Sequence, residues 1–207
     1  MKKTKIEALK TAIALPKFQH HFLLKIALTH PDYTYEQSNL TIHKQEKLVV
    51  EHQGLTNLGS AVFARIVTHY LSSRWRKLGE ATLIIIKSDL VSTEMLFKFA
   101  RELKLNKFAL LAESYSWKHK SERQKILAGI FEAVLGAIYL ELNQDLDKTE
   151  KWLGDRFLEP AVNNLLTEVF TAELEETEAD FQLLNWLESL GIPYLRCYYP
   201  HNPLPGY

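Results

Sequence analysis

Apolar residues recur at helical spacing along most of this chain. The clearest case lies between residues 48 and 75, where Leu55, Leu58, Val62, Ile66 and Tyr70 follow one another at intervals of three and four. This spacing places them on one face of a helix, which then has an apolar side and a polar side. The pattern predicts a long amphipathic helix that packs one face into a core.

The N-terminal part predicts two shorter helices. Apolar positions between residues 6 and 13 and between 22 and 27 have helical spacing, and Pro16 separates the two groups. The second helix should end at His30-Pro31, because proline cannot continue a helix. The polar stretch from residue 34 to 45 is interpreted as a loop or an irregular turn.

The central and later segments also favour helices. Residues 83–91 form a dense apolar patch, typical of a buried strand or a buried helix, and the helical neighbours favour the helix. Ser92 is placed to cap a helix through residues 95–105. Two more helices are predicted over residues 122–140 and 152–165. Six or more helices without a convincing strand pair predict an all-α bundle.

The C-terminal end differs in character. Residues 173–180 are acidic, and a short helix over 181–190 should end at Gly191 and Pro193. An aromatic, proline-rich tail follows. The short helix and the tail together could dock on the body or on a partner through Trp186, Tyr194, Tyr198 and Tyr199. We therefore predict a helical domain over residues 1–168, and over residues 169–207 an acidic linker, a short helix and a tail.

Charge and cysteine content narrow the class of protein. Lys+Arg and Asp+Glu both number 25, so the net charge of zero lacks the basic balance of a dedicated nucleic-acid binder. The lysines near the N-terminus and residues 118–125 nevertheless form basic clusters, with a solvated surface as the alternative interpretation. The single cysteine, Cys197, excludes an intramolecular disulfide framework and a cysteine-based zinc site.

No targeting or membrane-spanning segment is expected from the sequence. No run of about 18 apolar residues occurs, which argues against a transmembrane helix. Glu7 and Lys10 interrupt the apolar positions after the basic start, unlike a signal peptide. We expect a protein without membrane association, located in the cytoplasm or in an organelle interior.

Four segments, in order, carry a resemblance to the ribonuclease III catalytic domain. They are Ala27-Leu-Thr-His-Pro-Asp-Tyr33, Leu55-Thr-Asn-Leu-Gly-Ser-Ala-Val-Phe63, Lys87-Ser-Asp-Leu-Val-Ser92 and Ile126-Leu-Ala-Gly-Ile-Phe-Glu-Ala-Val-Leu-Gly-Ala-Ile-Tyr-Leu140. The resemblance covers roughly residues 5–168. It implies a helical endonuclease domain that acts on double-stranded RNA with Mg²⁺.

The resemblance also implies a metal site, which this sequence largely lacks. In the family, two facing helices present four carboxylates, because Mg²⁺ prefers oxygen ligands and activates water for attack on a phosphate. These positions fall here on Thr56, Ser60, Gly129 and Glu132, and an upstream acidic position falls on Gln53. Only Glu132 keeps a carboxylate. We therefore predict a pseudoenzyme without a cofactor, with Mg²⁺ only if the degenerate site still binds it.

Glu132 and Asn57 leave alternatives open. Glu132 could be a remnant ligand that binds a metal weakly, or it could accept a hydrogen bond from Thr56 or Ser60 across the two helices. At Asn57 the family has an aromatic residue that enters a socket on a partner subunit. A homodimer of the family type is therefore in doubt, and pairing with a related but different subunit is an alternative.

The basic run before the last matched helix is the candidate RNA-binding surface. It comprises Lys118, His119, Lys120, Arg123 and Lys125. Its alternative interpretation is an exposed helix start capped by Ser121. A few suitably spaced cations suffice for double-stranded RNA, since such RNA is recognised mainly by backbone shape. The histidines have no ligand spacing, and His30 is interpreted as structural.

Three functions remain as hypotheses from the sequence. The first is an inactive ribonuclease III-like protein that binds structured or double-stranded RNA in RNA processing or ribosome assembly. The second is a non-catalytic partner subunit or protein-interaction module, as a homodimer or heterodimer with a ribonuclease III-like chain. The third is a Mg²⁺-dependent nuclease with altered ligands, drawn from Asp89, Glu51, Glu113 and Glu122.

Overall fold

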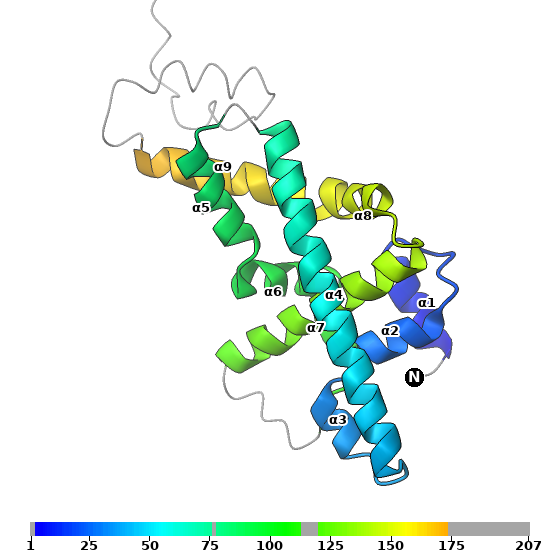
Figure 1. The fold of residues 1–207 in the computed structure, drawn as a ribbon. Coiled ribbons are helices and arrows are strands. Elements are labelled where there is room, and N and C mark those ends of the chain that lie inside the picture. Colours follow the sequence, from blue (N-terminus) through cyan, green and yellow to red (C-terminus); the bar gives the residue numbers. More distant parts are fainter. Residues whose placement is uncertain (1–2, 76–77, 113–119, 174–207) are drawn as a thin grey trace, which may run out of the picture. The chain divides into compact units, whose positions relative to one another are not determined.

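The computed structural model describes residues 3–75, 78–112 and 120–173, and within these ranges every regular element is a helix (Figure 1). The chain divides into two compact units, residues 1–158 and 159–207. The first unit contains α1 (Lys3–Ala12), α2 (His21–Ala27), α3 (Pro31–Tyr35), α4 (Ile42–Arg74), α5 (Glu80–Leu90), α6 (Thr93–Glu102), a 3₁₀ turn (Leu105–Lys107), α7 (Lys120–Glu141), α8 (Leu146–Leu153) and a π-helical turn (Gly154–Leu158). In the second unit, the described residues form α9 (Glu159–Glu173).

The long helix α4 and the apolar helix α7 form the centre of the first unit and cross each other (Figure 1). Their buried faces meet α6 at a cluster of phenylalanines. Phe131 of α7 lies 6.2 Å from Phe63 of α4 and 5.6 Å from Phe99 of α6, measured between ring centroids. Phe157 of the π-helical turn lies 5.0 Å from Phe99. The predicted all-α bundle is thus confirmed, with its core where these elements meet.

The crossing of α4 and α7 depends on two glycines. A Cβ atom added at Gly59 would lie 1.8 Å from the backbone oxygen of Glu132, and one added at Gly136 would lie 2.3 Å from the backbone oxygen of Leu55. No side chain fits at such distances, so the two helix backbones approach each other directly. This contact fixes the faces that α4 and α7 present beside it.

Backbone pairing positions the segment before α3. The amide of His30 donates to the carbonyl of Leu110 at 3.0 Å, and the amide of Leu110 donates to Leu28 at 2.8 Å. Pro31 then starts α3 at its first position, where a missing amide hydrogen costs nothing. The amide of Asp32 donates to Nδ1 of His30 at 3.3 Å, so the His30 side chain caps this helix.

The predicted elements need three corrections. The second helix ends at Ala27 and Pro31 opens the short helix α3. The stretch predicted as a loop, residues 34–45, therefore begins with the last two residues of α3 and ends with the first residues of α4, which starts at Ile42. The single helix expected over residues 152–165 is interrupted by the π-helical turn. The apolar patch at 83–91 is the favoured helix, yet Ile84 and Ile85 are 59% and 49% exposed, so it is not a buried helix.

Two further predictions are answered only for the described residues. The Ser92 cap is confirmed, because its side chain accepts a hydrogen bond from the amide of Met95 at 3.2 Å. The predicted domain boundary at 168/169 lies within α9, and the predicted short helix and aromatic tail lie outside the described residues. No helix in the described ranges is long and apolar enough to cross a membrane.

Candidate functional site

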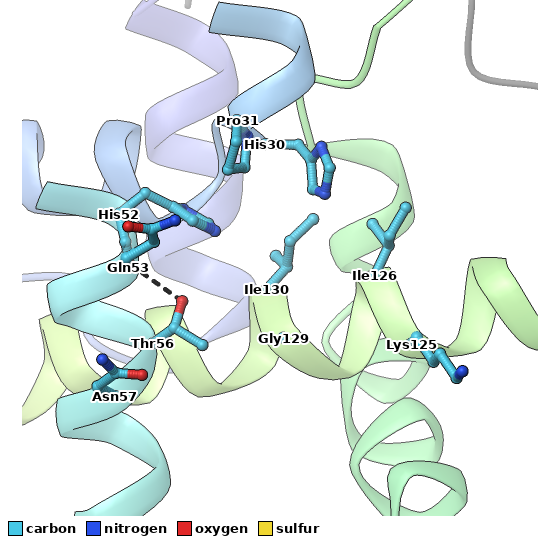
Figure 2. A pocket seen from close by; sticks show the side chains of 10 residues that line it. All are labelled: His30, Pro31, His52, Gln53, Thr56, Asn57, Lys125, Ile126, Gly129 and Ile130. Carbon is cyan, nitrogen blue, oxygen red and sulfur yellow. Dashed lines mark hydrogen bonds between the residues drawn. The ribbon is translucent and has the colours of Figure 1, made fainter. Parts of the chain in front are cut away.

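A pocket of about 490 Å³ opens beside the crossing of α4 and α7 (Figure 2). Three segments contribute to it: the start of α3, the first half of α4 and the first half of α7. The lining residues are His30, Pro31, His52, Gln53, Thr56, Asn57, Lys125, Ile126, Gly129 and Ile130. Two of the four positions that correspond to family carboxylates, Thr56 and Gly129, therefore lie in one pocket.

Helix α4 presents three polar side chains on one face, since residues three and four apart are neighbours on a helix. Gln53 and Asn57 are exposed, whereas Thr56 is half-buried between them. The Thr56 hydroxyl donates to the backbone oxygen of His52 at 3.0 Å, within its own helix (Figure 2). Of the two hydroxyls considered as donors to Glu132, Thr56 therefore makes a hydrogen bond within its own helix instead.

Helix α7 contributes two isoleucines to the pocket, and between them Gly129 leaves a space without a side chain. Ile126 and Ile130 flank Gly129, and a Cβ atom added at Gly129 would meet nothing within 4 Å. The absence of a side chain there is thus not required by packing, in contrast to Gly59 and Gly136. Lys125 is exposed at the edge of the pocket.

Two imidazoles close the pocket on the side of α3. Nδ1 of His52 lies 3.1 Å from the carbonyl oxygen of Ile26, and a carbonyl only accepts, so Nδ1–H donates and Nε2 of the neutral ring is left as an acceptor. Burial lowers the pKa of His52, and the nearby His30 lowers it further, while the hydrogen bond to Ile26 opposes the shift.

His30 has the structural role that its place in the sequence predicts, as the cap of α3. Burial also lowers the pKa of His30, although the carboxylate of Asp32 opposes this. No spacing pattern indicates that His30 and His52 share a pocket, because they lie far apart in the chain. Only the packing of α2 and α3 against α4 brings the two rings together.

Glu132 has a partner within the fold. Its side chain is half-buried, and burial raises the pKa of the Glu132 carboxyl, while a hydrogen bond with the Ser60 side chain lowers it. The cross-helix hydrogen bond expected for Glu132 is therefore made with Ser60. Glu132 is not among the described residues that line the pocket.

The residues at the family's metal positions do not fit Mg²⁺. The ion needs several oxygen ligands in near-octahedral geometry, and a single carboxylate with two hydroxyls does not supply them. In the described ranges, no group of three or more His, Cys, Asp or Glu side chains is placed to hold a metal ion. This includes the substitute ligands Asp89, Glu51 and Glu122, whereas Glu113 lies outside the described residues.

The structure describes part of the predicted RNA-binding run. Lys118 and His119 lie outside the described residues, as does the side chain of Lys120. Arg123 and Lys125 are exposed on the first turns of α7, and Lys125 also lines the pocket. Ser121 lies inside α7 and does not cap it, because the helix already includes Lys120.

Comparison with known proteins gives one consistent family. A family model described as Ribonuclease-III-like matches residues 20–160. Ribonuclease 3 of Syntrophomonas wolfei is 30% identical over 162 residues, which are 78% of this chain and 63% of that protein. Ribonuclease 3 of Nitratiruptor is 29% identical over 176 residues, covering 84% of this chain and 72% of that one. This chain thus spans roughly two thirds of the length of these two relatives.

A solved structure agrees with these sequence matches. The nuclease domain of ribonuclease III from Campylobacter jejuni superposes with a TM-score of 0.57 at 26% identity, covering 75% of this chain and 97% of that domain. That nuclease domain shows structural flexibility in a region involved in its dimer formation. The resemblance inferred from the four sequence segments is therefore confirmed in sequence and in fold.

Proposed function

This chain belongs to the ribonuclease III-like family, and we propose that it binds structured or double-stranded RNA without cutting it by the family's four-carboxylate mechanism. Its role would lie in RNA processing or ribosome assembly, where RNA must be held as well as cut. The proposal separates two properties of the fold: the surface that contacts RNA and the metal site that hydrolyses it.

The observation that carries the proposal is the chemistry of the pocket. No carboxylate is among the described residues that line it, although Thr56 and Gly129 correspond to positions where the resemblance implies metal ligands. The remaining carboxylate, Glu132, is hydrogen-bonded to Ser60, and burial favours its protonated form. Metal-assisted attack on a phosphate needs a cation that these residues are poorly suited to hold.

The RNA-binding half of the proposal is supported by the cations at the start of α7. Arg123 and Lys125 are exposed there, and Lys125 stands at the rim of the pocket. A phosphate backbone is attracted by such cations regardless of sequence, and double-stranded RNA is recognised mainly by its shape. A surface of modest charge therefore suffices for binding at low salt.

The test combines a binding assay and a cleavage assay on the full chain with a duplex of about 20 base pairs. We expect binding at low salt, where phosphate affinity is highest, and intact RNA after incubation with Mg²⁺ or Mn²⁺. Cleavage that disappears in Glu132→Ala would overturn the non-cutting proposal, and cleavage that persists in this variant would point to a contaminating nuclease. Absence of binding at low salt would overturn the RNA-binding proposal.

A second candidate, a silent partner subunit, is favoured by the exposed apolar side chains of α5. Ile84 and Ile85 are 59% and 49% exposed, and Val91 directly after the helix is 38% exposed. Apolar groups gathered on one element are typical of a protein interface. Native mass spectrometry of the chain purified from its source would show a homodimer or a heterodimer, and a monomer alone would contradict this role.

A further inference from the structure

The pocket beside the α4–α7 crossing has the chemistry of a site for a partly anionic ligand. Its described lining contains one cation, Lys125, and no carboxylate. Burial keeps His52 in its neutral form near neutral pH, since its pKa is lowered. The described lining has no negatively charged side chain that could bind a metal ion. A ligand that carries one phosphate and a neutral polar edge could instead bind Lys125 through the phosphate and the neutral polar side chains through its edge.

The opening at Gly129 suits a flat group. A Cβ atom at this position would meet nothing within 4 Å, so a planar ring can lie against the backbone of α7 between Ile126 and Ile130. The partly exposed side chain of Ile126 offers apolar surface to such a ring, whereas the side chain of Ile130 is fully buried. The pocket volume of about 490 Å³ also falls within the range of about 300–1,000 Å³ that is usual for small-ligand sites.

On the other side of the pocket, helix α4 presents hydrogen-bonding side chains one helical turn apart. Gln53 and Asn57 lie one turn apart on α4 with exposed side-chain amides, each of which carries two donor hydrogens and an acceptor oxygen. Nε2 of His52 adds an acceptor. Asparagine and glutamine amides are the side chains that pair with the edges of bases, and unpaired bases in RNA are recognised through those edges.

From this arrangement we propose that the pocket receives a single unpaired nucleotide of a structured RNA. The base lies against Gly129 and faces the amides of Gln53 and Asn57, and the phosphate of the same nucleotide contacts Lys125. The proposal rests on the proposed RNA-binding function and adds the class of RNA: a duplex with a bulged or extruded nucleotide is preferred over a fully paired one. A free nucleoside monophosphate shares this chemistry and is distinguished below.

The test compares two duplexes of about 20 base pairs that differ only in one central unpaired 2-aminopurine. Binding is measured by fluorescence anisotropy of an end label, and the 2-aminopurine emission reports where the unpaired base goes. We expect about tenfold tighter binding of the bulged duplex, since one good pairing with a base edge gives discrimination of this size. The wild-type chain should also change the 2-aminopurine emission on binding.

Filling the pocket provides the decisive variant. Gly129→Leu places a side chain in the opening without altering charge, and it should remove the preference for the bulged duplex while binding to the paired duplex persists. Gly54→Leu is the matched control, because Gly54 is exposed on α4, lies outside the pocket lining and also has nothing within 4 Å of an added Cβ. Circular dichroism and thermal melting confirm that both variants fold.

The outcomes separate this inference from the function on which it rests. Equal binding of both duplexes, or a preference that survives Gly129→Leu, would overturn the nucleotide pocket and leave RNA binding in place. Binding of neither duplex at low salt would overturn both. Adenosine monophosphate binding that depends on Gly129, without any preference for the bulged duplex, would assign the pocket to a free nucleotide and overturn the RNA form of the proposal.

Discussion

Two places on the same pair of helices use glycine in opposite ways. At the crossing, Gly59 and Gly136 are required because an added Cβ would fall within 1.8 Å and 2.3 Å of the facing backbone. About two turns away on α7, Gly129 has open space in front of it and lines the pocket. In the first region the close approach of the two helices requires glycine, whereas in the second region packing does not require it.

The largest expected effect comes from closing the crossing. Gly59→Ala and Gly136→Ala should each lower the free energy of unfolding by about 3 kcal/mol or more, because the helices must move apart and the overpacked core loses its fit. For a chain of this size that corresponds to a melting temperature lower by roughly 6–12 °C. Differential scanning calorimetry of the purified variants measures the change.

Matched controls lie on the same two helices. Gly54→Ala on α4 and Gly129→Ala on α7 meet open space, so they should raise stability by about 0.5–1 kcal/mol through the better helix propensity of alanine. If Gly129→Ala destabilised the chain as much as Gly136→Ala, the contrast between the tight crossing and the open pocket would be wrong.

The next largest effect on stability is expected when carboxylates are introduced at the family's metal positions. In Thr56→Glu/Ser60→Asp/Gly129→Asp the four family positions are acidic again, and the open space at Gly129 accommodates the new side chain. Repulsion among four carboxylates should destabilise the metal-free variant. Millimolar Mg²⁺ should then raise its unfolding free energy by about 2–3 kcal/mol, as expected for a site filled at about 100 times its dissociation constant.

Thermal shift with and without Mg²⁺ measures this effect, and the wild-type chain serves as the reference. Its melting temperature should barely move, because its one carboxylate at these positions is hydrogen-bonded to Ser60. A wild-type rise of several degrees in Mg²⁺ would reveal a metal site and contradict the proposed loss of cutting.

The parts of the fold that follow local patterns could be predicted from the sequence. The apolar stripe of α4, the apolar helix α7 and the Ser92 cap are encoded by residues close together in the chain, and the structure has all three. The start of α4 at Ile42 could not be found in this way. Ile42 and Val50 are 74% and 66% exposed there, so the first turns carry no stripe that marks a buried face.

The candidate site was predictable only in part, and for a physical reason. The positions of the missing carboxylates follow from the resemblance, since they occupy fixed places in matched segments. The pocket itself depends on segments that meet in space: His30 reaches it through backbone pairing with Leu110, and His52 is held by the carbonyl of Ile26. Neither contact leaves a spacing signal in the sequence.

The two histidines of the pocket should make the stability of the chain depend on pH. Burial lowers the pKa of His52 and of His30 below the ordinary 6.5, so the unfolded chain takes up protons below pH 6.5 that the folded rings resist. Stability conferred by these rings is complete above pH 6.5 and is lost as pH falls. Each ring contributes a slope of at most about 1.4 kcal/mol per pH unit.

The histidine slope is isolated by His52→Gln, with chemical denaturation measured between pH 5.5 and 7.5. This variant should be less sensitive to acid than the wild type, whatever its absolute stability. Glu132 acts with the opposite sign, since its pKa is raised from 4.5 and its contribution falls as pH rises. An unchanged slope in His52→Gln would show that the His52 ring takes up its proton over the same pH range in the folded and the unfolded chain.

The smallest effect concerns the rim of the pocket, where Lys125 should contribute one phosphate contact. Lys125→Ala should weaken binding of paired and bulged duplexes alike by roughly fivefold, and the slope of log affinity against log salt should become shallower by about 1. Lys98→Ala is the control, since Lys98 is an exposed cation on α6 that pairs with Glu94 at 3.4 Å. Because the lost interaction is a charge, Lys125→Arg should restore the salt dependence, and a failure to do so would assign Lys125 a role other than phosphate contact.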